Sequence, residues 1–227
     1  MRGISTLLLL KRVQDQLDTD RDPDGDQKNT AAPNSGAVYV FTHDGNTLGV
    51  GTYDEEGGKG AVYAFARKNG KWMQESRMHG SNAERGDSLG CSLAISDDGN
   101  TVVSGAFDED SILAGVNAPD AGANDEPSDT SAGIAYVFVR KDGKWSQEAA
   151  VKAFNTRLND QFGWALAMSL DGNTIAIGSH LEDSEATGVS GNQSGTGAED
   201  SGPVYVYTRG TPWKYENGVT SVWRPAP

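Results

Sequence analysis

One phrase, an Asp-Gly-Asn-Thr turn followed by alternating apolar residues, occurs three times in this chain and limits what it can fold into. The copies read "HDGNTLGVG" at 43–51, "SDDGNTVVSGA" at 96–106 and "SLDGNTIAIGS" at 169–179. Asp-Gly favours a tight hairpin turn, and the alternation that follows is typical of a β-strand. Three hairpins of one type in a single chain predict an array of repeated β units.

Longer matches surround each copy of this phrase. Residues 87–111 align without a gap on 160–184, and "GIAYVFVRKDGKWSQE" at 133–148 aligns on "GPVYVYTRGTPWKYE" at 202–216. The first copy is shorter, because "GAVYAFARKNGKWMQE" at 60–75 follows its hairpin after only "TYDEEGGK". The shared length indicates a duplicated unit with loops of variable length between its strands.

Each unit is interpreted as four short strands. The first of them, "WALAMS" from Trp164, is apolar or small on both sides, which suits a sheet packed between two other sheets. The fourth begins at Trp72, Trp145 or Trp213 and is half polar, as expected of an outermost strand. Repeated four-stranded meanders are the pattern of a β-propeller, in which neighbouring blades bury each other's faces.

The expected fold is therefore an all-β, propeller-type array of about three four-stranded antiparallel blades. We place an N-terminal segment with an acidic loop at 1–35 and the blades at 36–79, 87–154 and 160–224. Closed propellers have roughly 4–8 blades, so three blades predict an incomplete propeller or part of a larger one. The outer faces of the end blades would then be uncovered and available for self-association.

Charge and hydropathy exclude several classes of protein. The 227 residues carry a net charge of −13 at pH 7, which would repel a phosphate backbone, so no nucleic-acid partner is expected. The longest apolar run, "LLLL" at 7–10, is far shorter than the roughly 20 residues that span a bilayer, so no transmembrane segment is expected. The segment "MRGISTLLLL" has the Arg2 and the short apolar run of a stunted signal peptide, but no small-x-small cleavage site follows, so an accidental or truncated start is the favoured interpretation.

The stretch "DQFGWALAMSLDGNTIAIGSHLEDS" at 160–184 resembles the FG-GAP repeat family, the blades of integrin-α-like propellers, in its bacterial-type version with an "SGAVYVF" strand. Phe162-Gly163 matches the FG element, and the resemblance covers residues 18–216. It implies a non-enzymatic binding or cell-adhesion module, extracellular or at the cell surface, with a protein or glycan partner. The calcium loop of integrin-type repeats is replaced here by the short Asp-Gly turn, so the family's calcium ligands cannot be placed there.

The best candidate for a metal site is instead the stretch "DTDRDPDGD" at 18–26. Its alternating carboxylates and its glycine suit a hard cation such as calcium. The position where a bidentate glutamate would close such a loop is Ala31, so the pattern is incomplete. The stretch is either a weak calcium site or a solvated acidic loop. The candidate ligands are Asp20, Asp22, Asp24 and Asp26.

Further acidic residues recur directly after the second strand of each unit. In an antiparallel meander the second-to-third and fourth-to-first connections emerge on the same side. These acids should therefore share one face, the loop face, with the long loops 108–132 and 180–201. The members are Asp54, Glu55, Glu56, Asp108, Glu109, Asp110, Glu182 and Asp183.

Two functions are compatible with this loop face. The favoured one is a binding module that contacts its partner through the loops. The alternative is a carbohydrate-active enzyme that uses paired carboxylates, such as Glu109 with Asp110 or Glu182 with Asp183, for acid-base catalysis. Because the acids recur with the repeat, whereas one active site needs one constellation unlike its copies, we predict no catalytic residue and no enzymatic activity.

Overall fold

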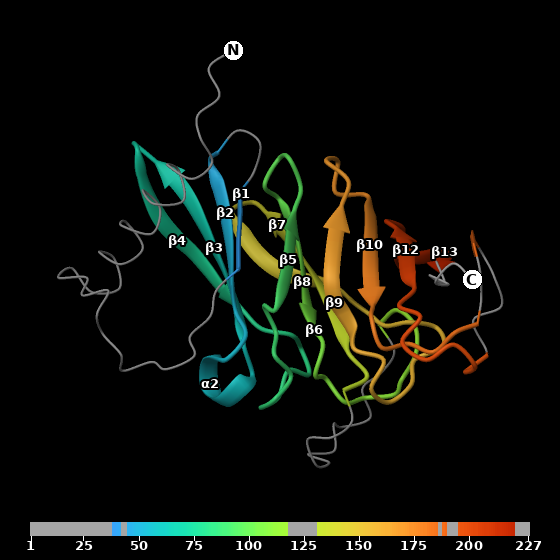
Figure 1. Ribbon diagram of the computed structural model, residues 1–227. Helices are drawn as coiled ribbons and strands as arrows, with labels where there is room; N and C mark the ends of the chain where they lie inside the picture. The colour runs from blue at the N-terminus through green and yellow to red at the C-terminus, as the bar shows by residue number, and fades with distance from the viewer. Residues whose placement is uncertain (1–37, 42–44, 118–130, 186–187, 190–194, 221–227) are drawn as a thin grey trace, which may run out of the picture.

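The computed structural model of the chain describes five stretches of it. These are residues 38–41, 45–117, 131–185, 188–189 and 195–220. They form three antiparallel sheets that stand side by side in chain order, as Figure 1 shows from left to right. The expected all-β fold is confirmed. The four aspartates proposed as calcium ligands lie outside the described residues.

The first sheet consists of four strands in sequence order, with a single helical turn, α2, after its second strand. Its strands are β1 (Val38–Phe41), β2 (Thr47–Thr52), β3 (Ala61–Lys68) and β4 (Lys71–Met78), and α2 covers Glu55–Gly58. β1 pairs antiparallel with β2, Tyr39 lying opposite Val50. The sequence of β1, "VYVF", is similar to the "VYVY" of a third strand at 204–207, yet β1 occupies the position of a first strand.

The second and third sheets repeat this order with longer loops. The second sheet contains β5 (Ser92–Ile95), β6 (Thr101–Ala106), β7 (Ile134–Lys141) and β8 (Lys144–Val151). The third contains β9 (Phe162–Met168), β10 (Thr174–Ser179), β11 (Gly188–Val189), β12 (Val204–Thr208) and β13 (Lys214–Thr220). The extra strand, β11, pairs with the outer edge of β13.

The long second-to-third loops turn back along the outer edge of their own sheet. In the third sheet this return forms β11, and in the second sheet Val116 makes an isolated bridge with Val151 of β8. The Asn117 backbone N–H donates to Ala150 O at 2.8 Å. An outer strand otherwise presents unpaired backbone groups, so the returning loop protects the edge.

The Asp-Gly turns have the same internal hydrogen bonds in the second and third sheets. Ser96 Oγ donates to Asp98 Oδ1 at 2.6 Å, and the Asn100 backbone N–H donates to the same oxygen at 2.9 Å. Asp171 accepts the equivalent bonds from its own neighbours at 2.6 and 3.0 Å. Gly99 follows with φ of 66°, a conformation that glycine adopts without strain.

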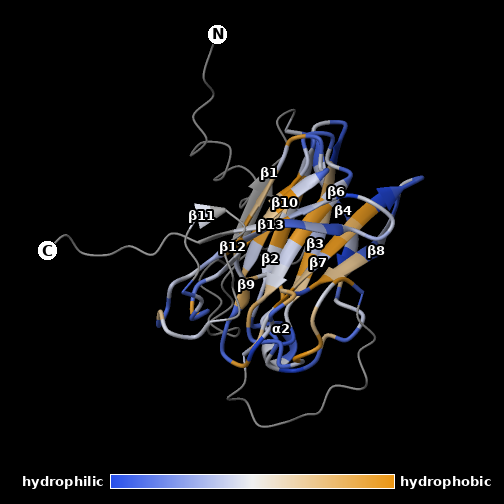
Figure 2. Ribbon diagram, turned by 90° about the vertical axis from the view of Figure 1, so that its right-hand side faces the viewer, coloured by the Kyte–Doolittle hydropathy of each residue, from blue (hydrophilic) through white to orange (hydrophobic). Residues whose placement is uncertain are grey.

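Each sheet has one bulky face and one face of smaller side chains, and successive sheets pack bulky against small. Tyr136 and Phe138 of β7 lie in one buried cluster with Val62 and Ala64 of β3. A second cluster joins the tyrosines of β12 to the small residues of β7 in the same way. Figure 2 shows apolar residues along the strands and hydrophilic ones in the loops at both ends. In the third sheet, Val204 on the small face is 38% exposed.

Two glycine pairs explain the FG element at the start of the first strand, which is Phe162-Gly163 in the third sheet and Leu89-Gly90 in the second. Gly163 (φ 94°) lies so close to Gly105 that a Cβ added to Gly105 would stand 2.0 Å from the Gly163 carbonyl oxygen. Gly51 and Gly90 approach each other equally closely. The preceding residue, Phe162, is fully buried and bridges Gly133 of the sheet before it. The element therefore anchors each sheet to its predecessor.

A salt-bridge clamp also joins successive sheets. The fourth strand has a bulge at Glu75 in β4 and at Glu148 in β8, where the register skips one residue. Arg140 of β7 contacts Glu75, and Arg209, which follows β12, contacts Glu148 at 3.0 Å. The Arg140 guanidinium also lies 5.4 Å from the ring centre of Trp145, within the range of a cation–π contact.

Candidate functional site

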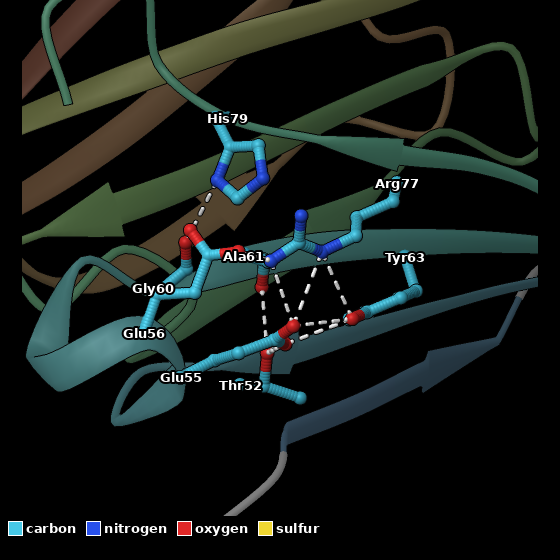
Figure 3. A network of polar contacts seen from close by, with 8 residues as sticks. All are labelled: Thr52, Glu55, Glu56, Gly60, Ala61, Tyr63, Arg77 and His79. Atoms are coloured by element: carbon cyan, nitrogen blue, oxygen red, sulfur yellow. Dashed lines mark hydrogen bonds and ion pairs between the residues drawn. The ribbon is translucent and has the colours of Figure 1, made fainter.

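The glutamate after the second strand contacts the tyrosine of the third strand directly in the first sheet and through an asparagine in the other two sheets. In the first sheet, Glu55 accepts hydrogen bonds from the Tyr63 hydroxyl at 2.6 Å and from Thr52 Oγ1 at 2.7 Å (Figure 3). Arg77 Nη2 lies 2.8 Å from Glu55 Oε1 and 2.6 Å from Glu56 Oε1. Burial raises the pKa of Glu55, but the hydrogen bonds from Tyr63, Thr52 and Arg77 outweigh it and hold the pKa below its usual value.

In the second sheet the equivalent acid is Glu109, whose side chain is buried. Asn82 Nδ2 donates to Glu109 Oε1 at 3.0 Å, and the Tyr136 hydroxyl donates to Asn82 Oδ1 at 2.7 Å. The other carboxylate oxygen of Glu109 forms an ion pair with Lys152, which directly follows β8 and is also buried. Asn82 belongs to the linker between the first two sheets, so this network fixes the linker to the second sheet.

The third sheet repeats the Tyr–Asn–Glu arrangement. Asn155 Nδ2 donates to Glu182 Oε1 at 2.8 Å, and the Tyr205 hydroxyl donates to Asn155 Oδ1 at 2.8 Å. The Ser184 backbone N–H donates to Glu182 Oε2 at 2.9 Å, and Arg157 Nη1 lies 4.0 Å from Oε1. Burial is the main cause that raises the pKa of Glu182. We call each such set a latch, since it ties a linker to the sheet that follows it.

The remaining predicted loop-face acids lie nearer to solvent. Asp54 is exposed, and Asp110 is half-buried. Asp108, also half-buried, accepts hydrogen bonds from Ser88 Oγ at 2.8 Å and Ser131 Oγ at 2.9 Å. Asp183 accepts the Asp200 backbone N–H at 3.0 Å. The eight acids are thus divided between buried latch positions and positions closer to the loop surface.

Two buried aspartates next to the latches were not identified from the sequence. Asp87 Oδ2 accepts the backbone N–H of Glu84 at 2.7 Å, and Asp160 Oδ2 accepts that of Arg157 at 2.8 Å. Burial, followed by nearby carboxylates that include Glu109 or Glu182, raises the pKa of both aspartates to about 7. Asp160 lies two residues before Phe162, and Asp87 lies two residues before its counterpart Leu89, and this equal spacing was the available signal.

A cavity of about 180 Å³ lies beside the latch of the second sheet. Its walls come from the linker after β4, from the start of the loop after β6 and from the outer strand β8. Hydroxyl and amide side chains dominate the polar part of the lining, and the buried Glu109–Lys152 pair completes it. The polar lining residues used below are Ser81, Asn82, Glu109, Ser111, Asn117, Gln147 and Lys152.

Of the predicted site residues that the structure describes, only Glu109 lines this cavity. Sequence reasoning missed Gln147 and Lys152, because both follow the half-polar pattern of an outer strand. Among the described residues, no group of three or more His, Cys, Asp or Glu side chains is placed to hold a metal ion. No helix in this part of the chain is long and apolar enough to cross a membrane.

Comparisons with known proteins give a family match and likenesses to solved structures. Residues 145–207 match the family described as FG-GAP repeat. The fold is similar to the crystal structure of TolB from Acinetobacter baumannii, with a TM-score of 0.40 and 11% sequence identity. That alignment covers 80% of this chain and 32% of TolB, so the chain spans about a third of the length of that structure. A comparison with curated proteins found no match.

The matched segment runs from β8 to β12. It contains Phe162-Gly163 and the Asp171-Gly172 turn, the residues on which the sequence resemblance rests. The family expectation is confirmed for this segment, since residues 145–207 match the FG-GAP repeat.

Proposed function

We propose that the chain is a non-enzymatic binding module of the FG-GAP propeller type, extracellular or at the cell surface, which holds a protein or glycan partner through its loop face. The observation that carries this proposal is the polar cavity of about 180 Å³ among the loops of that face. A concave site with convergent polar groups is the usual form of a binding site.

The differences between the three sheets support a loop-face site. The clamps, the glycine pairs and the Asp-Gly turns recur nearly unchanged, and they hold the scaffold together. The second-to-third connections differ, with α2 in the first sheet, the bridge at Val116 in the second and β11 in the third. Loops on a constant scaffold are where binding residues are usually found.

The contacts of the two buried glutamates support a structural role for them. Both oxygens of Glu109 contact protein groups, Asn82 and Lys152, and both oxygens of Glu182 do so as well. A catalytic acid or base needs a carboxylate within reach of the substrate proton. We therefore assign these residues to the latches, and the proposal includes no catalytic step.

The proposal has two further parts, which rest on the sequence. One is a weak calcium site at Asp20, Asp22, Asp24 and Asp26, where the ion would relieve repulsion between neighbouring carboxylates. The other is self-association through an uncovered end face. The exposure of Val204 on the small face of the third sheet supports this second part.

A residue-resolved NMR screen tests the loop-face assignment. The ¹⁵N-labelled chain is titrated with a library of small neutral and charged fragments, and each bound fragment is recovered afterwards. We expect chemical-shift changes to gather at Asp108, Ser111 and Asp183 and the recovered fragments to be chemically unchanged. Changes gathered at the opposite turns, Asp98 and Asp171, would contradict the assignment, and conversion of a fragment would contradict the non-enzymatic role.

A further inference from the structure

We propose that the cavity beside the second latch binds one neutral, hydroxyl-rich ring, such as a single uncharged sugar residue. This inference rests on the proposed binding function and adds the chemical class of the ligand. Four features of the cavity carry it: its departure from the repeat, its charge balance, its hydrogen-bonding groups and its size.

The cavity combines lining residues that no other sheet has together. Gln147 lies opposite Phe138 in the β7–β8 register, whereas Tyr215 takes this position in the third sheet. The first sheet has Gln74 there, but its shorter loop has no counterpart of Asn117. Lys152, which directly follows β8, is replaced by His79 after β4. A site specific to one ligand requires such a unique combination, whereas residues shared by all copies serve the scaffold.

The charges in the cavity wall already compensate each other. Glu109 and Lys152 form a buried ion pair, and their side chains are only 3% and 4% exposed. A charged ligand would add an uncompensated charge beside this pair, at a desolvation cost that its contacts would have to offset. The net charge of −13 further disfavours an anion. The charge balance therefore indicates a neutral ligand.

The remaining polar groups suit hydroxyls. Gln147 Oε1 accepts the Ser81 backbone N–H at 2.8 Å, and Gln147 Nε2 donates to Ser81 Oγ at 3.1 Å, which leaves one amide hydrogen for a ligand. Asn117 Oδ1 accepts the Ala150 backbone N–H at 2.9 Å, and its Nδ2 donates to none of the described residues. Hydroxyls of a ligand can both accept from these amides and donate to the hydroxyl oxygens of Ser81 and Ser111.

The apolar lining and the volume indicate a single ring. Leu113, Ile134 and Ala150 also line the cavity and can contact the C–H groups of a sugar. Its volume of about 180 Å³ is below the roughly 300–1,000 Å³ of pockets that hold drug-sized ligands. An extended chain of sugars would not fit, but its terminal residue would.

Saturation-transfer NMR and calorimetric titration of the full chain test this inference. The probes are glucose, galactose, mannose and N-acetylglucosamine, with glucuronate as the charged counterpart. We expect at least one neutral sugar to bind with a Kd on the order of 1 mM, as is usual for a small ligand with few contacts. Glucuronate is expected to bind at least tenfold more weakly than that sugar.

Matched variants locate the binding. Gln147→Ala should weaken the neutral sugar at least fivefold, and Gln74→Ala, at the same register position one sheet earlier, should leave its affinity unchanged. Ser111→Leu narrows the cavity without changing the contact between Ser81 and Gln147, and it should abolish binding. Thermal melts show whether each variant is folded. Because two cavity variants are tested, the second still tests the inference if the first does not fold.

The inference is overturned if no neutral sugar binds at 50 mM, if glucuronate binds best, or if the cavity variants bind as the unaltered chain does. These outcomes are distinguishable from failure of the proposed function. Fragments that bind at the loop face, together with sugars that do not bind, would remove the ligand class and leave the binding function in place.

Discussion

Arg140 Nη1, near the end of β7, lies 2.5 Å from Glu75 Oε2 on β4 of the preceding sheet. The contact joins two sheets whose strands β4 and β7 are not paired with each other. The same guanidinium donates from Nε to Asn100 Oδ1 at 2.9 Å and from Nη2 to Thr47 Oγ1 at 3.3 Å. Burial raises the pKa of Glu75, but hydrogen bonding to Arg140 outweighs this and holds the pKa below its usual value.

The clamp predicts that substitution of two equivalent arginines, Arg140 and Arg67, changes the free energy of unfolding by different amounts. Arg140→Ala should lower the free energy of unfolding by about 1–3 kcal/mol, because it removes charge-assisted hydrogen bonds from a partly buried carboxylate. Arg67 occupies the equivalent position of the first sheet and is exposed, so Arg67→Ala should change stability by less than about 0.5 kcal/mol. Urea denaturation of both variants measures the difference. Equal effects would mean that the clamp adds nothing to stability.

The latch of the third sheet predicts coupling between a tyrosine and an asparagine. Asn155→Ala should cost about 1–3 kcal/mol, since it removes a hydrogen bond from buried Glu182 and leaves the Tyr205 hydroxyl without its acceptor. Tyr205→Phe should cost less, because it removes only the hydroxyl. In a double-mutant cycle the two substitutions should be non-additive by more than about 0.5 kcal/mol. Additive effects would contradict a shared network.

The buried aspartates predict a pH dependence of stability. The folded-state pKa of Asp160 is raised to about 7 from its ordinary 3.8, so the folded chain binds more protons than the unfolded chain between these values. Stability contributed by the protonated form is therefore present at low pH and lost as the pH rises through about 7.

Asp160→Asn mimics the protonated form and should raise the melting temperature at pH 8 by about 2–4 °C, the change expected for roughly 1 kcal/mol in a chain of this size. The gain should shrink toward pH 4. Asp171→Asn is the control with the opposite sign, because hydrogen bonds from Ser169 and Asn173 lower the pKa of Asp171. Melts from pH 4 to 8 measure both variants, and a gain for Asp160→Asn that does not vary with pH would contradict the assignment.

The end face of the third sheet predicts self-association. Val62 is fully buried by the second sheet, whereas Val204 at the equivalent position is 38% exposed. Light scattering should therefore show a mass that rises above that of a monomer with concentration, and Val204→Asp should restore the monomer. Leu170→Asp, at an exposed turn of the same sheet, should leave the association unchanged. A monomer at every concentration would contradict this part of the proposal.

Calcium should stabilise the chain weakly if the aspartates at 18–26 bind it. At ten times the dissociation constant, binding to the folded form adds about 1.4 kcal/mol. A melt in 10 mM calcium should thus lie a few degrees above a melt in chelator. Asp22→Ala combined with Asp24→Ala should remove the difference. Identical melts with calcium and with chelator would show that this stretch is a solvated loop.

The strands and turns could be predicted because their causes are local. Asp171 and Gly172 fix their hairpin through bonds to residues two or three positions away, and the alternation after the turn sets which side chains of β10 are buried. The FG element was recognisable as a motif. Its physical reason, the close approach of Gly105 and Gly163, became apparent only from the packing of two sheets.

The latches and the cavity could not be predicted in the same way. A glutamate in a polar loop is ordinarily exposed, and nothing adjacent in sequence shows that Glu109 is buried with Lys152, 43 positions away. The return of the loop to Val151 depends on a backbone bridge to the edge of β8. What the sequence did contain was the difference between Gln147 and Tyr215 and between Lys152 and His79, which only the structure connects to a cavity.

Hydrogen–deuterium exchange with a bound ligand tests the central claim, that this scaffold binds its partner through the loop face. The chain is saturated with the tightest-binding fragment or sugar and compared with the free chain. We predict slower exchange in the linker 79–87 and in the loop 107–117, with no change in the turns 97–100 and 170–173. Slower exchange in those turns, with the linker and loop unaffected, would contradict the claim.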